Sequence, residues 1–341
     1  MARKVTLKEI AKEVGLSVTT VSLVLNDREC RVSEENRRRI KTIAREKHYV
    51  PNQIARSLVT QHSMTLGLIV PDLETHLYGA MAKKLERICR EAGYALFITS
   101  SHDHTVDDMR LLHMFWNRGV DGVFYVPSTK SATSNELMDM LSNYAIPGVV
   151  IGRSAVHVPW DSVSFDNRAG GRVATRALLD AGHTKIGCLI NATHTVSGHQ
   201  RAEGYVEAFH EAGLKFDQSL IVECDRSIEG GRTGCEKLLE AGVTGIVAAD
   251  DILTYGTMHT LYAHGLKVPD DISVVGYDLA GMRDMFSPAI TTVDANIDEM
   301  ISQAFDLLST RLGKDAEEPS EKKLHHMIAP CLTHKASIGN L

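Results

Sequence analysis

The sequence of 341 residues lacks the short motifs that mark several large classes of enzyme. It contains no GxGxxG or GxxxxGKS/T phosphate-binding loop, no GxSxG nucleophile turn and no HExxH zinc motif. These absences argue against nucleotide-dependent, hydrolytic and zinc-dependent chemistry. We therefore expect a protein that is not an enzyme and that needs no cofactor.

Cysteine is scarce and scattered. The six cysteines form no CxxC pair, and most of them fall within apolar patterns, which favours buried free thiols over disulfides or a zinc site. The 16 histidines show no metal-ligand spacing, so we predict no metal site. No apolar run approaches the roughly 20 residues of a membrane span, and no apolar signal region follows Met1. We expect a cytoplasmic protein without a membrane partner.

The sequence does contain a helical N-terminal region. Apolar residues recur at helical spacing within 7–14 and again within 18–25, and Gly15 supplies a tight turn between them. Ser17 is placed to cap the second helix, and Ser33 to begin a third. The pattern predicts a helix-turn-helix bundle, whose second helix can lie in the major groove of DNA.

The charge distribution separates this region from the rest of the chain. Residues 1–62 hold 13 Lys and Arg against 7 Asp and Glu, whereas the remaining residues hold 24 against 36. A small charged bundle could simply be a solvated domain. A basic head on an acidic body, however, is what binding of DNA phosphates by one end of the chain requires.

From Thr65 onward, short apolar strands alternate with helical patterns. The expected strands lie at 66–70, 95–99, 122–126 and 148–152, and then at 185–190, 220–224, 245–250 and 272–278. Such alternation is typical of buried parallel sheets covered by helices on both faces. The predicted fold class is α/β, with an N-terminal helix-turn-helix bundle followed by two doubly wound parallel-sheet lobes.

This organisation predicts the domain boundaries. We expect a helix-turn-helix DNA-binding domain over 1–50, a hinge helix and linker over 51–64, and a two-lobed ligand-binding and dimerisation domain over 65–341. Three crossovers of the chain would make each lobe from two segments. The first lobe should comprise about 65–163 and 292–323, and the second about 164–291 and 324–341.

Pro51 opens a short segment in which Ile54, Ala55 and Leu58 share one helical face. Isolated helices shorter than about 12–15 residues are marginal in water, so this segment should be helical only when something holds it. A linker with a chance apolar stripe is the alternative interpretation.

The chain resembles the lactose-repressor (LacI/GalR) family of transcription regulators. The resemblance rests on TLKEIAKEVGLSVTTVSLVLN at 6–26, RVSEENRRRIKTIAREKHYVPNQIARSLVTQ at 31–61, LGLIVPD at 66–72, RAEGY at 201–205 and ISVVGYD at 272–278. It implies two lobes of periplasmic-binding-protein type behind the DNA-binding head, and a function as an effector-responsive regulator.

The resemblance also implies which residues contact DNA. Val18, Thr19 and Leu23 would read bases in the major groove, while Leu58 would act as a wedge in the minor groove. Position 23 is Leu where most of the family carries a base-reading Arg, so the operator is not expected to follow the family consensus. The DNA-contact candidates are Thr6, Ser17, Val18, Thr19, Thr20, Ser22, Leu23, Asn26, Asn52, Ala55, Arg56 and Leu58.

Effector contacts should come from residues that follow the strands, in the cleft between the lobes. The resemblance implies that Arg201 and Asp278 hold the effector, since a guanidinium and a carboxylate suit vicinal sugar hydroxyls. An ion pair between Arg201 and a carboxylate in an empty cleft is the competing account. The effector-contact candidates are Asp72, His76, Tyr78, Ser128, Trp160, Ser197, Arg201, Asp250 and Asp278.

Some of these candidates have simpler explanations. Ser128 could be a helix cap, His76 an exposed loop residue, and Trp160 a lid over the hinge instead of a stacking surface for a sugar. The family's usual Asn-Pro-aromatic-aromatic sequence is replaced by Thr-His-Leu-Tyr at 75–78, so only Tyr78 retains an aromatic ring. The effector therefore cannot be copied from a relative.

We predict a homodimeric transcription regulator, a repressor of carbohydrate-use genes that binds a near-palindromic operator in double-stranded DNA and responds to a small effector, a sugar. An exported sugar-binding protein would share the two lobes but would have no use for a basic helical head. A sugar-processing enzyme would need an acid–base pair, for which Asp72 and Asp278 are the obvious carboxylates, but sugar binding explains them better.

Overall fold

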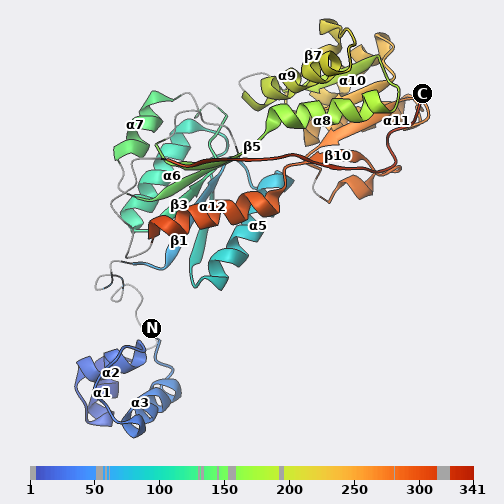
Figure 1. Cartoon of the computed structure of the whole chain (residues 1–341). Coiled ribbons are helices and arrows are strands. Elements are labelled where there is room, and N and C mark those ends of the chain that lie inside the picture. Colours follow the sequence, from blue (N-terminus) through green and yellow to red (C-terminus); the bar gives the residue numbers. More distant parts are fainter. Residues whose placement is uncertain are drawn as a thin grey trace. The chain divides into compact units, whose positions relative to one another are not determined.

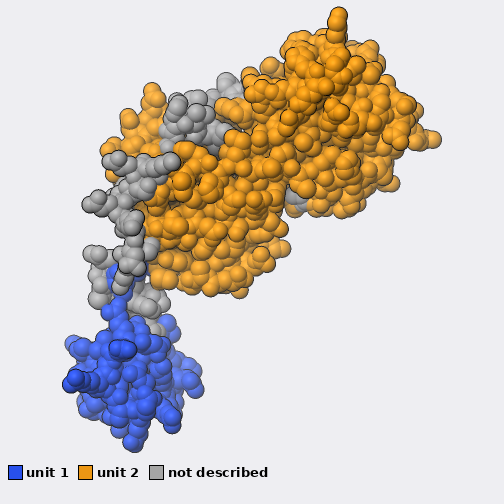
Figure 2. All heavy atoms as spheres, viewed as in Figure 1, with its two compact units in different colours: residues 1–63 blue, residues 64–341 orange. Residues whose placement is uncertain are grey.

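The computed structural model describes residues 5–50, 57, 60, 62–129, 131, 134–143, 146–152, 159–191, 196–279, 281–312 and 323–341. The chain forms two compact units, residues 1–63 and residues 64–341, which are coloured separately in Figure 2. Of the predicted DNA contacts, Asn52, Ala55, Arg56 and Leu58 lie outside the described residues.

The described part of the first unit contains the expected helices, α1 (Leu7–Val14), α2 (Val18–Leu25) and α3 (Glu34–Glu46) (Figure 1). Thr6 and Glu9 begin α1 with a reciprocal capping box, each side chain binding the other residue's backbone N–H. Gly15 ends α1 with a φ of +77°, a left-handed conformation that glycine adopts readily. Ser17 and Ser33 cap α2 and α3. The prediction of a helix-turn-helix bundle is confirmed.

The apolar faces of these helices meet in one small core. Ile10, Val21, Val24 and Ile40 are fully buried there. The outward face of α3 carries exposed basic side chains, namely Arg38, Arg39, Lys41 and Arg45. The bundle thus uses its apolar residues internally and keeps these basic side chains at its surface, where they can meet phosphates.

The first lobe of the second unit is built on a parallel sheet in the order β11-β5-β4-β3-β1-β2. Its strands are β1 (Thr65–Val70), β2 (Ala95–Ser100), β3 (Gly122–Tyr125), β4 (Gly148–Gly152), β5 (Asp161–Phe165) and β11 (His325–Ile328). Its helices are α5 (His76–Glu91), α6 (Thr105–Arg118), α7 (Asn135–Asn143) and α12 (Ile297–Leu312). Helices α5 and α12 share one hydrophobic cluster with the sheet, and α6 and α7 share another, so both faces are covered.

The second lobe repeats this plan in the order β12-β10-β9-β8-β6-β7. Its strands are β6 (Ile186–Ile190), β7 (Ile221–Glu223), β8 (Gly245–Ala248), β9 (Ser273–Tyr277), β10 (Thr291–Asp294) and β12 (Cys331–Thr333), of which β12 is antiparallel to β10. Its helices are α8 (Asn167–Asp180), α9 (Val196–Glu211), α10 (Ile228–Glu240) and α11 (Asp251–Ala263), with short turns at Gln218–Leu220 and Arg283–Met285. Within the described ranges, no helix is long and apolar enough to cross a membrane.

The chain crosses from one lobe to the other at different positions from those predicted. Strand β10 pairs with β9 in the second lobe, although 292–323 was assigned to the first lobe. Strand β11 pairs with β5 in the first lobe, although 324–341 was assigned to the second. The crossovers therefore follow β5, β10 and β11, and the last appears in Figure 1 as the long red passage between the lobes. A segment belongs to the lobe in which its strand pairs, and the local composition of the segment does not show which strand that partner is.

Strand β5 was not predicted because its sequence, DSVSF, is rich in polar residues. Asp161 is buried but forms an ion pair with Arg311, whose Nε and Nη2 lie 3.0 and 3.1 Å from the two carboxylate oxygens. Ser162 shares a hydrogen bond of 2.8 Å with Nδ1 of His325 on the neighbouring strand. Side-chain partners from α12 and β11 thus satisfy polar groups that would otherwise be costly to bury.

Helix α9 lies very close to α8, as Figure 1 shows. A Cβ atom at Gly171 would lie 2.0 Å from the carbonyl oxygen of Arg201, and one at Gly204 would lie 2.0 Å from that of Arg168. Only glycine permits this approach of two backbones, because any side chain would collide with the other helix. The contact fixes the position of Arg201.

Substitution of Gly171 by alanine should force the two helices apart. We expect Gly171→Ala to lower the free energy of unfolding by about 1–3 kcal/mol, as overpacked sites do, when urea denaturation is measured on the full chain. Gly79→Ala in α5 is the matched control, because its added methyl group would meet nothing closer than 3.9 Å. That control should gain up to about 1 kcal/mol. A Gly171→Ala variant as stable as the wild type would contradict the close contact.

Candidate functional site

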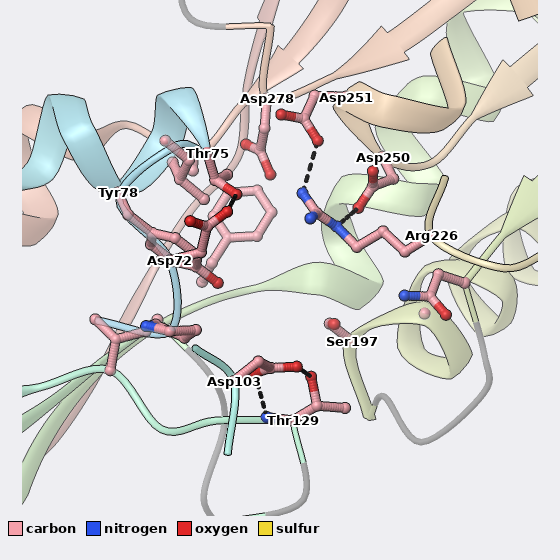
Figure 3. A pocket seen from close by; sticks show the side chains of 18 of the residues that line it. Asp72, Thr75, Tyr78, Asp103, Thr129, Ser197, Arg226, Asp250, Asp251 and Asp278 are labelled. Atoms are coloured by element: carbon pink, nitrogen blue, oxygen red, sulfur yellow. Dashed lines mark hydrogen bonds and ion pairs between the residues drawn. The ribbon is translucent and has the colours of Figure 1, made fainter. Parts of the chain in front are cut away.

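The carboxyl ends of the strands in both lobes surround a cavity of about 860 Å³. The first lobe contributes residues that follow β1, β2 and β3, and the second lobe contributes residues that follow β6, β7, β8 and β9. Polar side chains point into this space from both sides, as Figure 3 shows. This is the location expected for a ligand in open parallel sheets.

The structure brings most of the predicted effector contacts to this cavity. The lining includes Asp72, Tyr78, Ser197, Arg201, Asp250 and Asp278. Three other candidates, His76, Ser128 and Trp160, lie outside the lining.

The surroundings of these three residues explain their positions. Ser128 is buried behind the cavity wall, where its N–H donates to Oδ2 of the buried Asp108 over 3.0 Å. Trp160 is buried against Gly148, at which a Cβ atom would lie 2.1 Å from the indole ring. His76 is exposed at the start of α5. Ser128 and Trp160 therefore have structural contacts in the first lobe.

Arg201 is held by protein groups on every side. Its Nε donates to Oδ1 of Asn167 over 2.9 Å, its Nη1 donates to the carbonyl oxygen of Ala249 over 2.5 Å, and its Nη2 lies 3.4 Å from Oδ2 of Asp278. Its guanidinium carbon lies 3.9 Å from the centre of the Tyr277 ring, a cation–π contact. An ion pair between Arg201 and a carboxylate was the alternative to effector binding, and the structure contains that ion pair.

Asp278 combines backbone strain with an unused acceptor. Its φ is +53°, in the left-handed region, and its N–H donates to the carbonyl oxygen of Val293 over 2.9 Å. Its Oδ1 is buried and has no hydrogen-bond partner among the described residues. Burial raises the pKa of Asp278 to about 6, although the charge of Arg201 opposes this shift. A hydroxyl group of a ligand could satisfy the unused oxygen.

Arg226 was not among the predicted contacts, yet it lines the same cavity. Its Nε donates to Oδ2 of Asp250 over 2.8 Å, and its Nη2 donates to Oδ1 of Asp251 over 2.9 Å. Asp250 also caps α11, because its Oδ1 accepts a hydrogen bond from the N–H of Ile252 over 2.9 Å. Arg226 follows the predicted strand at 220–224, and the rule that selected the other candidates would have selected it too.

The acidic residues of this wall affect one another. Burial and the neighbouring charge of Asp250 raise the pKa of Asp251 to about 7, while Arg226 opposes the shift. Burial by itself would lower the pKa of Arg226, but the two carboxylates outweigh it and raise that pKa. The guanidinium therefore stays charged.

The first lobe presents carboxylate oxygens that its own loops hold in place. Asp72 accepts hydrogen bonds of 2.9 Å from the N–H of Glu74 and the hydroxyl of Thr75, and these bonds lower its pKa. Asp103 accepts from the N–H and the hydroxyl of Thr129 over 2.7 and 2.6 Å. Both carboxylates stay in fixed positions, where they can accept hydrogen bonds from a ligand.

The second helix of the head presents a mixed apolar and polar surface. Val21 and Val24 are buried, whereas Val18 is 39% exposed and Thr19 is also exposed. The remaining described candidates are exposed or partly exposed. Thr6 lies at the start of α1, and the others lie on α2 or at its ends, namely Ser17, Thr20, Ser22, Leu23 and Asn26. All of the described candidates are thus accessible to some degree.

A helix-turn-helix head and a cleft between two parallel-sheet lobes define a DNA-binding regulator with a small-molecule-binding domain. Residues 6–52 match the family model for bacterial regulatory proteins of the lacI family. Residues 63–329 match the model for periplasmic binding proteins and the sugar-binding domain of the LacI family. The chain belongs to the LacI family of bacterial transcriptional regulators, as the sequence resemblance predicted.

Relatives along nearly the whole chain are regulators. The HTH-type transcriptional regulator DegA of Bacillus subtilis (strain 168) is 32% identical over 87% of this chain and 88% of its own length. The HTH-type transcriptional repressor PurR of Escherichia coli O139:H28 (strain E24377A / ETEC) is 30% identical over 98% of this chain and 97% of its own length. The non-enzymatic function of these relatives agrees with the absence of enzyme motifs in the sequence.

Solved structures share the fold. The lac repressor dimer bound to operator and the anti-inducer ONPF gives a TM-score of 0.85 at 22% identity, over 98% of this chain and 99% of that one. A complex of the transcriptional regulator CelR with cellobiose gives 0.71 at 26% identity, over 98% of this chain and 100% of that one. The first of these similarities concerns the fold alone.

The raised pKa of Asp278 predicts a specific pH dependence of stability. Its ordinary pKa is 3.8, so between about pH 4 and 6 the folded chain holds a proton that the unfolded chain has lost. Stability contributed by this group is therefore present at low pH and is lost as pH rises through about 6. We expect the unfolding free energy of wild type, relative to that of Asp278→Asn, to fall by roughly 2 kcal/mol from pH 4 to pH 7.

Urea denaturation at intervals of half a pH unit measures this difference, because groups common to both proteins cancel. Parallel profiles for the two proteins would contradict the shifted pKa.

Proposed function

We propose that the protein is a repressor that binds a near-palindromic operator as a homodimer, and that a sugar in the cleft sets its affinity for the operator. The observation that carries the proposal is the convergence of acceptor and donor groups from both lobes on one cavity, with the buried Oδ1 of Asp278 unused. Because an operator-binding protein must share a compartment with its DNA, we place it in the cytoplasm.

The proposed DNA contacts rest on the exposed face of α2. Val18 and Thr19 carry methyl groups on this face, and apolar contact with the thymine methyl group is their natural chemistry. The basic side chains of the head would neutralise phosphates and position the helix. Two heads related by dimer symmetry would require an operator with two similar half-sites.

Deletion of residues 1–63 should abolish operator binding and leave sugar binding intact, because the second unit has its own cores. The operator can be obtained by selection from random DNA with the full chain. The affinity of the full chain for this operator should fall steeply with salt concentration, since cation–phosphate contacts release counterions. Electrophoretic mobility shifts between 50 and about 200 mM salt test both expectations. Equal operator affinity of the truncated protein would contradict the assignment of DNA binding to the head.

The proposed dimer contact lies at the β2 edge of the first sheet. Strand β2 has a neighbour only on its β1 side within the described sheet, and Phe97 and Ile98 are 45% and 37% exposed. An exposed edge strand with large apolar side chains is a site for association with another chain. A second copy of the protein would cover the edge and the apolar side chains together.

A charge placed in this contact should separate the subunits. We expect Phe97→Asp to raise the dimer dissociation constant at least tenfold, because a carboxylate would be buried without a partner. Met327→Asp is the matched control, since Met327 is 66% exposed on β11 at the opposite edge of the same sheet. Sedimentation velocity over a range of protein concentrations measures the dimer. If Met327→Asp dissociates the dimer and Phe97→Asp does not, the contact lies at the other edge.

A carbohydrate effector is supported by the chemistry of the cleft and by the relatives. Carboxylates and guanidinium groups lie close together, which suits adjacent hydroxyl groups that both donate and accept hydrogen bonds. The related regulator CelR has been solved as a complex with cellobiose. Sugar binding would close the lobes, and closure would alter the dimer and the DNA-binding state of the heads. Whether the sugar weakens or strengthens operator binding is decided by repeating the operator selection with a panel of sugars.

A further inference from the structure

The second lobe presents two arginines to the cleft, and they differ in their access to a ligand. The side chain of Arg201 is 12% exposed, and each of its nitrogens contacts a protein oxygen. The side chain of Arg226 is 36% exposed. Its Nη1 has no hydrogen-bond partner among the described residues, while its Nε and Nη2 bind Asp250 and Asp251. Of the two, Arg226 is the cation that a ligand can meet directly.

Arg226 also determines the charge of its wall of the cleft. Asp250 and Asp251 are adjacent at the start of α11, and their side chains are only 14% and 5% exposed. One guanidinium thus serves two buried carboxylates. Without it, nothing would oppose the burial and the mutual repulsion that already raise the pKa of Asp251, and the neighbouring carboxylate would lose its counter-ion.

The opposite wall places further acceptors across from this guanidinium. Figure 3 shows Arg226 reaching from the second lobe into the cavity, with Asp72 and Tyr78 on the other side. The charge of Arg226 also contributes to the lowered pKa of Asp72, so the two groups influence each other across the cleft. A ligand between them would donate hydrogen bonds to Asp72 and accept them from Arg226.

We propose that Arg226 is a specificity-determining residue, which makes the cleft select an uncharged sugar over the amino sugar that carries an ammonium group in place of one hydroxyl. An ammonium group cannot accept a hydrogen bond from the guanidinium, and the two cations repel each other. Loss of Arg226 would leave a carboxylate that attracts the ammonium group. The inference rests on the proposed function, because it assumes that the effector is a sugar.

Matched pairs of sugars test this assignment on the full chain. The probes are D-glucose with D-glucosamine, D-galactose with D-galactosamine, and D-mannose with D-mannosamine, titrated by calorimetry at pH 6.5. The proteins are wild type, Arg226→Gln, the charge-retaining Arg226→Lys, and Arg232→Gln. Arg232 is the control because it lies on α10 outside the cavity lining, 46% exposed and paired with Glu229. Operator affinity and thermal unfolding establish that each variant is folded.

Wild type should bind the neutral member of a pair more tightly. Arg226→Gln should shift the affinity ratio toward the amino sugar at least tenfold, while Arg226→Lys and Arg232→Gln keep the wild-type preference. If Arg226→Gln lost affinity for both sugars of a pair by the same factor, Arg226 would only support the structure. That result would overturn this inference and leave the proposed function intact. Failure of wild type to bind any of the six sugars would contradict the carbohydrate effector, and the inference with it.

Discussion

The parallel direction of the strands determines where the ligand cavity forms. Strands β1 to β10 run parallel within their sheets, so the loops that follow them gather at one end of each lobe. The cavity lies where these ends meet, and its lining comes from segments as distant in sequence as Asp72 and Asp278. Because the chain crosses between the lobes after β5, β10 and β11, closure of the cleft must involve all three crossovers. A ligand that contacts both lobes can therefore act on the relative position of the lobes.

Within this cleft, charges are paired in a way that favours function over stability. Burying the Arg201–Asp278 pair carries a desolvation penalty that its long contact of 3.4 Å does not fully offset. Asp278 also adopts a strained backbone conformation and leaves one oxygen unused. Strain and unsatisfied polar groups persist in folded proteins where the surrounding structure holds them, most often at binding sites. The close packing of α9 on α8 at Gly171 is what holds Arg201 in place here.

Local sequence patterns predicted most of the secondary structure. The caps at Ser17 and Ser33, the turn at Gly15 and the apolar strand runs each depend on neighbouring residues, and each is found as expected. Strand β5 escaped prediction because the polar side chains of Asp161 and Ser162 find partners 150 and 163 residues away. The same dependence on distant partners placed β10 and β11 in the lobes opposite to those expected.

The candidate site was also predicted only in part from local sequence. The rule that ligands bind after parallel strands brought six of the nine effector candidates to the cavity, but it could not distinguish a side chain that faces the cleft from one that faces inward. Ser128 follows its strand as Asp72 does, yet it binds the buried Asp108, a partner that no local pattern reveals. Arg226 also follows a strand but was overlooked. Its role depends on ion pairs with Asp250 and Asp251 at the start of α11, which no local pattern reveals.

The proposed function requires that occupancy of the cleft and binding of the operator be coupled. The most direct test measures operator affinity of the full chain with and without a saturating sugar, and sugar affinity with and without operator. We expect both affinities to change, and by the same factor, because coupling between two binding sites is reciprocal. A sugar that fills the cleft and leaves operator affinity unchanged would show that the two sites are not coupled.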